Sequence, residues 1–351
     1  MTTPVVALIV NFNSGALLER ALDGLDGQAV SEILVVDNAS HDLSWQAALG
    51  RPGAGLERLG PEVRLERLGP EVRLERLENN VGFAAAVNHG LARTKAPYVL
   101  LLNADVDLDD GYVASLADAL DGDPGLAAAT GTLVLPDGLV DSTGISISTA
   151  RWATDRDRGA TPQENSPEEA GTPERAEPFG VSGAAGLFRR SAVEPAGGLW
   201  EDLFVYWEDT ELAWRLRLGG WRFALVPGAR AVHQRGSDSA DPTFVEAANF
   251  GNRLATVARH EGLRGLLRPS TLAVTLVTGS RLAVRHRRAL RTSRPWKSVR
   301  SGLSARRSDR EEARPDRPGR APLPFESHPW AAWLSAQFSG GKRGLGAVQS
   351  P

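Results

Sequence analysis

One short stretch, residues 98–111, constrains the fold of this chain more than any other. It reads YVLLLNADVDLDDG, in which a five-residue apolar run stops at Asn103 and four carboxylates follow. A run so short and so uniformly apolar is typical of a strand buried on both faces, as in a parallel sheet. The sequence therefore predicts an α/β protein with Asp105 and Asp107 at the carboxyl end of a core strand, where open α/β sheets bind ligands.

The spacing of these two aspartates allows a metal site but does not require one. Hard divalent cations take oxygen ligands, and Asp-x-Asp can supply two of them. A solvated acidic turn is the alternative, and for an isolated Asp-x-Asp it is the more common one. The rest of the chain has to separate these two interpretations.

The flanking segments predict further strands and helices in alternation. Apolar runs and helical spacing of leucines indicate β-α-β units with polar, turn-prone residues after the strands. Ser14 is expected to cap the first helix. The predicted strands are 5–10, 32–36, 72–77, 98–102, 126–135, 179–188 and 221–226, and the predicted helices are 16–25, 84–93, 111–120 and 210–218.

Residues 51–77 contain an unusual repeat. LERLGPEVR at 56–64 recurs without change at 65–73. Two copies of nine residues are too few and too short for a stacked repeat architecture. We interpret 51–77 as a duplicated surface segment in which the second copy leads into the third strand; a binding module is the alternative.

Composition limits the compartment and the chemistry. The chain has no cysteine, so disulfides and thiolate metal sites are excluded, and its formal net charge is only -3. The first ten residues lack a basic region and run directly into an apolar strand, unlike a signal peptide. No apolar run approaches the roughly 20 residues of a spanning helix. We expect a cytoplasmic protein, either soluble or peripheral on the inner face of the membrane.

Two regions depart from the α/β pattern. Residues 151–178 are rich in Pro, Gly and Glu and are expected to form a mobile loop. From 253 to 320 there are 18 Lys or Arg and 5 Asp or Glu. We expect a helical basic extension at 241–290 and a largely disordered tail at 291–351. Because aromatic residues do not alternate with the arginines, contact with an anionic membrane surface is favoured over nucleic acid, with a merely solvated tail as the remaining alternative.

Seven motifs in a fixed order give the chain a family resemblance. It resembles the family 2 inverting glycosyltransferases of the GT-A fold, a Rossmann-like, mostly parallel sheet flanked by helices, and within them the bacterial rhamnosyltransferases that use dTDP-L-rhamnose. The resemblance covers about residues 4–240, the expected catalytic domain 1–240. The motifs are VNFNS at 10–14, VVDNAS at 35–40, NNVGFAAAVNHG at 79–90, LLNADVD at 101–107, VSGAAGLFRR at 181–190, YWEDTELAWR at 206–215 and VHQRGS at 232–237.

The resemblance implies a donor site at the strand ends. Asp37 is expected to accept hydrogen bonds from the nucleotide base, with a turn or helix cap as the alternative. Amides both donate and accept, which suits base or ribose edges, and Gly82 allows close approach of the backbone, although a plain glycine at a helix start is equally consistent. The expected donor-binding residues are Asn11, Asn13, Asp37, Asn38, Gly82, Asn88, Asn103 and Asp105.

A divalent metal, Mg or Mn, is implied at Asp105 and Asp107, with His233 as a further ligand. The metal would offset charge on the leaving diphosphate. A histidine after a strand can instead be purely structural.

The implied catalytic base is Asp209, because inversion needs one base opposite the leaving group. Glu208 is expected to orient the loop or contact the acceptor. The helix dipole would keep Asp209 ionised, so a raised pKa would have to come from burial. The expected acceptor-side residues are Ser182, Gly183, Ala184 and Trp207, and loop 151–178 is expected to act as a lid.

The expected activity is transfer of a sugar, L-rhamnose from dTDP-rhamnose, to a cell-envelope glycan or lipid-linked acceptor, with no nucleic acid as partner. A transferase that uses UDP-hexose or UDP-galactofuranose is the alternative among enzymes. A nucleotidyltransferase would need a basic, glycine-rich phosphate loop after the first strand, and residues 11–15 carry no charge. A non-catalytic nucleotide-sugar-binding or membrane scaffold protein would be expected to lose Asp105, Asp107 or Asp209, and all three are present.

Overall fold

The computed structural model describes residues 3–49, 62–65, 71–162, 177–235, 241–285, 295–312 and 323–326. The chain divides into two compact units. Unit 1 comprises Met1–Ile145, Asp155–Phe204 and Glu208–Ser239, and unit 2 comprises Ser146–Thr154, Val205–Trp207 and Ala240–Pro351.

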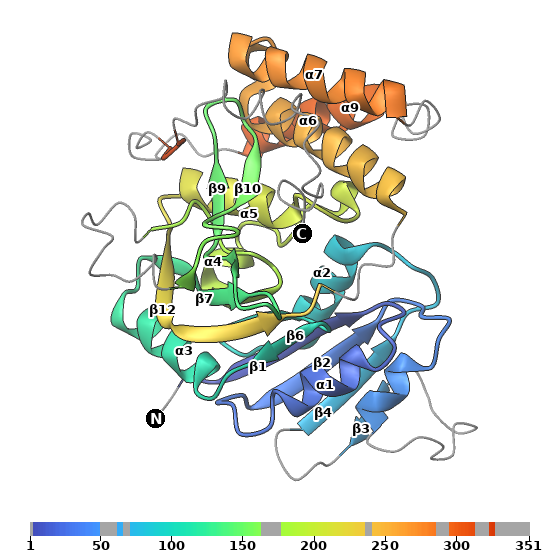
Figure 1. The fold of residues 1–351 in the computed structure, drawn as a ribbon, viewed down its shortest axis with the longest axis vertical. Coiled ribbons are helices and arrows are strands. Elements are labelled where there is room, and N and C mark those ends of the chain that lie inside the picture. Colours follow the sequence, from blue (N-terminus) through green and yellow to red (C-terminus); the bar gives the residue numbers. More distant parts are fainter. Residues whose placement is uncertain are drawn as a thin grey trace. The chain divides into compact units, whose positions relative to one another are not determined.

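Unit 1 is built on a ten-stranded mixed sheet of strand order β3-β4-β2-β1-β5-β11-β7-β12-β6, with β8 paired to β7. The half formed by β4, β2, β1 and β5 is parallel, and β11 joins it antiparallel to β5 (Figure 1). The predicted α/β class is therefore confirmed. The strands are β1 (Val5–Asn11), β2 (Glu32–Asp37), β3 (Glu62–Leu65), β4 (Glu71–Arg76), β5 (Tyr98–Asn103), β6 (Val106–Leu108), β7 (Leu126–Val134), β8 (Val140–Ser142), β11 (Ala185–Arg189) and β12 (Arg222–His233).

The register of the parallel strands brings their polar ends together. Asn11 of β1 is level with Asp37 of β2, and Val10 is level with Asn103 of β5. Because parallel strands all end at the same edge, the loops that follow them share that edge. The donor-side motifs therefore meet there.

Helices cover both faces of the sheet. In β1, Ala7 and Ile9 belong to the core cluster that contains Leu18 and Leu22 of α1 (Leu17–Asp23). On the opposite face, Leu8 lies against Gly90 of α2 (Phe83–Arg93), where a Cβ atom would approach the Leu8 side chain to 2.4 Å. This alternation of faces is what a strand buried on both sides requires. The remaining helices of unit 1 are α3 (Tyr112–Gly122), α4 (Arg190–Val193) and α5 (Glu208–Leu218), with short 3-10 turns η1 (Ser44–Leu49) and η5 (Glu201–Leu203).

Several element boundaries differ from the sequence prediction. The first helix begins at Leu17 with Ala16 at its N-cap and no side-chain cap, so Ser14 is not the cap; its backbone carbonyl instead accepts a hydrogen bond from the amide of Leu17. The last strand of unit 1, predicted at 221–226, continues to His233 because its second half pairs with β6 as well as β7.

The duplicated segment adds a strand at the edge of the sheet. The EVR that ends the first copy and the following Leu65 form β3. It runs antiparallel to β4, which starts with the EVR of the second copy, and Val63 lies opposite Leu74 and Leu65 opposite Val72. The second copy supplies the third parallel strand, as the sequence predicts. Residues 50–61 and 66–70 lie outside the described residues.

The segment predicted as a mobile loop, 151–178, begins in regular structure. β9 (Ile145–Ile147) and β10 (Ala153–Asp155) form a two-stranded sheet. The part of the loop at 163–176 lies outside the described residues.

Unit 2 is mainly helical, with α6 (Pro242–Leu266), α7 (Pro269–Arg285) and α9 (Pro295–Glu312). Phe250, Leu254 and Leu282 form its apolar core, with Val299 of α9 packed against it. No helix in the described residues is long and apolar enough to cross a membrane.

The expectation of a largely disordered 291–351 needs correction at α9. Arg259 of α6 forms an ion pair with Asp309, at 2.9 Å between Nε and Oδ2, and Arg306 donates to the backbone carbonyl of His260. The packing of Val299 and these charged contacts stabilise a helix that composition alone does not predict. Apart from 295–312 and 323–326, this segment lies outside the described residues.

Candidate active site

Asp37 and Asn11 lie at the ends of neighbouring parallel strands and are both fully buried. Asn11 Nδ2 donates to Asp37 Oδ1 at 2.8 Å, and Arg76 Nε donates to Asp37 Oδ2 at 3.2 Å. Arg76 also lies over the ring of Trp45, 3.9 Å from its centroid. The structure thus brings these two predicted donor residues together, with the Asp37 carboxylate paired to protein groups.

Asn13 and Asn38 fix the loops that follow β1 and β2. Asn13 has a left-handed backbone (φ 53°), and its Oδ1 accepts from the backbone amide of His41 at 2.8 Å. Asn38 Oδ1 accepts from the amide of Val81 at 2.9 Å. Both side chains therefore connect loops at the strand ends where the sequence predicts a donor site. At the end of β5, the backbone amide of Asn103 donates to Ala184 O at 2.8 Å.

Gly82 and Asn88 are fixed by the segment that precedes α5. Gly82 has φ 89°, and a Cβ atom there would approach Phe204 Cδ2 to 2.5 Å, so a side chain is excluded by both conformation and space. Asn88 Nδ2 donates to the carbonyl of Leu199 at 2.8 Å, and its Oδ1 accepts from the Leu199 amide at 2.8 Å. The side-chain amide of Asn88 thus holds the Leu199 backbone, and its predicted contact with the base or ribose stays a prediction.

Asp105 and His233 come together from different strands. His233 Nε2 lies 3.4 Å from Asp105 Oδ1, and His233 Nδ1 lies 2.8 Å from Asp141 Oδ2. All three side chains are buried. Burial opposes the charged form of the imidazole, but the hydrogen bonds of Asp105 and Asp141 outweigh it and raise the pKa of His233.

Asp141 is surrounded by positive charge. Arg235 donates to it from Nε and from Nη2, the latter at 2.8 Å, and Nη2 also reaches Asp155 Oδ2 at 2.9 Å. Burial acts to raise the pKa of Asp141, but His233 and Arg235 lower it below its ordinary value. Burial raises the pKa of Asp155 to about 6 despite Arg235. We call Asp141, Asp155, His233 and Arg235 the Asp141 cluster.

Asp107 is turned toward a cation of the protein. Its Oδ2 lies 2.6 Å from Arg20 Nη2 and accepts from Gln234 Nε2 at 2.8 Å. Among the described residues no group of three or more His, Asp or Glu side chains is arranged to hold a metal. Of the three predicted metal ligands, the structure brings Asp105 and His233 together. Asp107, two residues after Asp105, is partly exposed and paired with Arg20.

The donor set nevertheless fits a divalent cation. A histidine that binds a metal commonly gives its other ring nitrogen to a carboxylate, which fixes the tautomer and the ring orientation. His233 has this arrangement, with Nδ1 on Asp141 and Nε2 directed at Asp105.

Glu208 and Asp209 form the first residues of α5. Burial raises the pKa of Glu208 to about 8, assisted by the negative charge of Asp209. Burial also raises the pKa of Asp209, although the amides of Gly183 and Thr210 donate to its carboxylate at 3.3 and 2.6 Å. Within the described part of the chain, no ion pair reaches this Glu208–Asp209 pair. Glu208 Oε2 is buried there without a hydrogen-bond partner.

Two of the predicted acceptor-side residues lie at the Asp209 carboxylate or next to a residue that does. Gly183 contacts Asp209 through its amide, and Ser182 Oγ accepts from the Ala184 amide at 3.2 Å. Trp207 belongs to unit 2 and directly precedes Glu208 in the chain, with a left-handed backbone (φ 73°). Asn252 of α6 donates to the carbonyls of Val205 and Tyr206 at 2.8 and 2.9 Å, which ties this strained segment to unit 2.

Sequence reasoning missed Asp141, Arg235, Arg76 and Phe204. Asp141 follows an ordinary turn, and nothing in its local sequence connects it with a histidine 92 residues away. Arg235 stood inside the VHQRGS motif and could have been noticed there; the final Gly and Ser of that motif lie outside the described residues.

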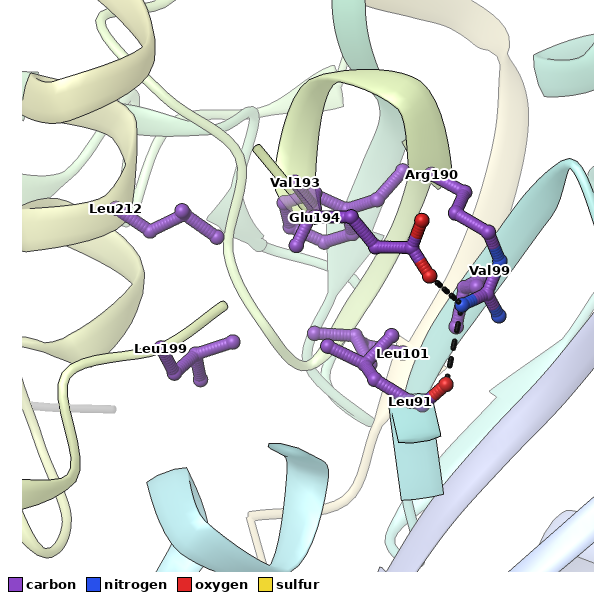
Figure 2. A pocket seen from close by; sticks show the side chains of 9 residues that line it. Leu91, Val99, Leu101, Arg190, Val193, Glu194, Leu199 and Leu212 are labelled. Atoms are coloured by element: carbon purple, nitrogen blue, oxygen red, sulfur yellow. Dashed lines mark hydrogen bonds and ion pairs between the residues drawn. The ribbon is translucent and has the colours of Figure 1, made fainter. Parts of the chain in front are cut away.

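A separate apolar pocket lies on the α2 side of the sheet, and none of the sequence-predicted site residues lines it (Figure 2). Leu91, Leu101, Leu199 and Leu212 point into it, and the Arg190–Glu194 ion pair lies at its edge, at 2.7 Å. The two charged side chains in its lining, Arg190 and Glu194, are paired with each other, and the other lining side chains are apolar.

Comparison with known proteins agrees with this geometry. The model of the family described as "Glycosyl transferase family 2" matches residues 6–194. An N-acetylglucosaminyl-diphospho-decaprenol L-rhamnosyltransferase of Mycobacterium tuberculosis is 32% identical over 314 residues, which are 83% of this chain and 95% of the relative.

Solved glycosyltransferases share the fold at low identity. GalNAc-T7, solved with UDP, GalNAc and Mn²⁺, is 15% identical with a TM-score of 0.55, over 80% of this chain and 55% of that one. TarS of S. aureus is 13% identical with a TM-score of 0.52, over 87% of this chain and 50% of that one. The chain thus spans about half the length of these two structures. The expected GT-A fold is confirmed. On the family match and the 32% identical relative, the chain belongs to glycosyltransferase family 2, close to the rhamnosyltransferases, and is a glycosyltransferase.

Proposed function

We propose that the chain transfers L-rhamnose from dTDP-rhamnose to a glycan or lipid-linked acceptor, with inversion at the anomeric carbon and with a divalent metal. The observation that carries the catalytic part is the buried Glu208–Asp209 pair, which forms no ion pair with the residues that the structure describes and has raised pKa values. The relative's name supports the donor sugar and a lipid-diphosphate acceptor.

Asp209 acts as the general base. Its carboxylate takes the proton of an acceptor hydroxyl while that oxygen bonds to the anomeric carbon and the bond from this carbon to the diphosphate breaks. Burial raises the pKa of Asp209 and so strengthens its basicity, in contrast to the dipole at the start of α5, which favours the ionised form. The amides of Gly183 and Thr210 hold the carboxylate in place.

Glu208 is the second carboxylate of the pair. Its buried Oε2 and its pKa of about 8 make it a group that keeps its proton at neutral pH, so it can donate a hydrogen bond to the acceptor. Gly183 and the small residues on either side of it leave room for the acceptor sugar beside Asp209.

Asp105 and His233 would hold the divalent metal, Mg or Mn, together with oxygens of the donor diphosphate. Asp107 would join them after its carboxylate leaves Arg20. When bound, the metal offsets the charge that develops on the leaving diphosphate. Asp141 directs Nε2 of His233 toward Asp105 by accepting the hydrogen of Nδ1.

The donor nucleotide is assigned to the strand ends of β1, β2 and β4. Asp37 and Asn11 lie there with Arg76, and a base that reaches Asp37 would have to replace one of its bonds to these residues. Asn13, Asn38 and Gly82 shape the loops around that position rather than contact the base.

The acceptor is proposed to be presented at the inner face of the cell membrane, which the protein contacts peripherally from the cytoplasm. Loop 151–178 is proposed to close over the bound donor. Transfer from a UDP-hexose or UDP-galactofuranose is the second candidate, because GalNAc-T7, one of the solved structures that share the fold, was solved with UDP.

A donor panel tests this proposal. Purified full chain is incubated with Mn²⁺ and either dTDP-rhamnose, UDP-glucose or UDP-galactofuranose, and release of the nucleoside diphosphate is measured with and without EDTA. We expect hydrolysis or transfer with dTDP-rhamnose and loss of it with EDTA. Turnover with a UDP-sugar alone would replace the donor assignment, and turnover unchanged by EDTA would remove the metal from the proposal.

A further inference from the structure

The exposed face of α7 is unusual for a helix of a globular unit. Leu272, Leu276 and Val284 are between 37% and 80% exposed. At 100° per residue they lie within an arc of about 120°, opposite the buried Thr271, Val274 and Leu282. A helix that buries one face usually presents polar residues on the other. α7 instead exposes Leu272, Leu276 and Val284 on its outer face.

The corner before α7 continues this surface. Leu263 and Leu267, at the end of α6, are 57% and 67% exposed. The chain turns there because Gly262 interrupts the helix with φ 68° and ψ -158°. We call Leu263, Leu267, Leu272, Leu276 and Val284 the α7 surface.

The charged side chains of residues 262–285, the segment that carries most of the α7 surface, are all positive, and two acidic residues of α6, Glu246 and Glu261, lie near them. Between Gly262 and Arg285 the sequence has four arginines and no acidic residue. Arg264, Arg268 and Arg285 are exposed; Arg268 and Arg285 have only long contacts with acidic groups of α6, at 3.7 Å to Glu261 and 3.8 Å to Glu246. Exposed apolar side chains edged by arginines are what an amphipathic helix needs to lie in the interface of an anionic bilayer.

We infer that the α7 surface binds the anionic lipid surface of a membrane. The leucines and Val284 enter the boundary between headgroups and acyl chains, and the arginines pair with lipid phosphates. The inference rests on the proposed function only in that a lipid-linked acceptor gives the contact its purpose. It narrows the expected membrane contact of the basic C-terminal region, which includes residues 241–290, to one face of an ordered helix and the corner before it.

A vesicle assay tests it with the full chain and no donor or acceptor present. The protein is sedimented with vesicles of phosphatidylglycerol and phosphatidylcholine in equal parts, or of phosphatidylcholine alone. The double variant Leu272→Glu/Leu276→Glu should bind the anionic vesicles roughly tenfold less or worse, because it removes two apolar contacts and adds two negative charges. The control Leu139→Glu adds a charge at an exposed leucine of unit 1 and should bind like the wild type.

Further variants separate folding and charge from apolar contact. Leu272→Ser/Leu276→Ser should also bind less, and unchanged thermal melting shows that unit 2 is folded. Arg264→Gln/Arg268→Gln should lower binding to the anionic vesicles without changing binding to phosphatidylcholine. The vesicle assay measures no sugar transfer. A negative vesicle result therefore does not contradict the proposed transferase activity, and a negative donor panel does not contradict membrane binding by the α7 surface.

Equal sedimentation of wild type and the leucine double variant would overturn the inference. So would light scattering that shows a wild-type dimer converted to a monomer by the leucine variant, without vesicle binding by either, since the α7 surface would then join two copies of the chain.

Discussion

Two groups of buried carboxylates in unit 1 differ in what surrounds them. In the Asp141 cluster, Arg235 and His233 compensate the charge, and the pKa of Asp141 lies below its ordinary value. No cation reaches the Glu208–Asp209 pair in the described residues, and both pKa values are raised. Burial acts in the same direction in both places, so His233 and Arg235 account for the lowered pKa of Asp141. For Asp155 of the same cluster, burial outweighs Arg235 and the pKa is raised to about 6.

The difference separates two tasks. A carboxylate that stays ionised can hold a histidine in one tautomer and keep it directed at a metal. A carboxylate with a raised pKa can take and release a proton near neutral pH. We therefore propose that Asp141 orients His233 and that Asp209 transfers the proton.

The strongest test removes the base from the uncompensated pair. Asp209→Asn should reduce sugar transfer by between about 10² and 10⁴-fold, because the amide cannot take the acceptor proton. Binding of the donor, measured by calorimetry, should be unchanged. Asp110→Asn, at an exposed aspartate after β6, is the matched control and should be active. Transfer at the wild-type rate by Asp209→Asn would remove this residue as the base.

The second test alters the compensated cluster. Asp141→Asn should weaken binding of Mn²⁺ in the presence of dTDP by roughly 10- to 100-fold, because the His233 tautomer is no longer fixed. Titration calorimetry or the signal of free Mn²⁺ in electron paramagnetic resonance measures this without turnover. The exposed Asp137→Asn in the adjacent turn is the control. Equal affinity in both variants would show that Asp141 does not act through His233.

The smallest effect concerns stability and pH. Glu208 has an ordinary pKa of 4.5 and a folded pKa of about 8, so the unfolded chain loses this proton first as pH rises. The free energy of unfolding should therefore fall between about pH 4.5 and pH 8 because of Glu208. Glu208→Gln, which resembles the protonated acid, should raise it by roughly 1–3 kcal/mol at about pH 9 and much less at about pH 4. Thermal melting at both values measures the difference, and an equal change at both would refute a raised pKa.

Local sequence was sufficient for the parallel half of the sheet. The apolar runs at 5–10, 32–36 and 98–102 each became a strand within about one residue at its end, because a strand buried on both faces must be apolar throughout. The order of the motifs was also sufficient to place Asp105, His233 and Asp209 in one unit. These predictions depend on neighbours in the chain, which a sequence displays directly.

Tertiary contacts decided other parts of the site. Asn88 has the side chain of a nucleotide ligand, but the Leu199 backbone occupies its amide. Asp107 belongs to the predicted metal pair, but Arg20 of α1, 87 residues away, takes its carboxylate. In both cases the partner comes from a distant segment, so the local motif could not indicate it.

The sequence by itself determined the α/β class, the strand ends that carry the polar loops and the family of the enzyme, because periodicity and ordered motifs are local properties. Only the tertiary structure decided which carboxylates have a compensating cation. Asp141 obtains His233 from the end of β12 and Arg235 from the residues just after it, whereas Glu208 and Asp209 obtain no cation from the described residues. A pKa depends on burial and on charges within a few ångströms, and those are fixed only when distant strands and helices pack together.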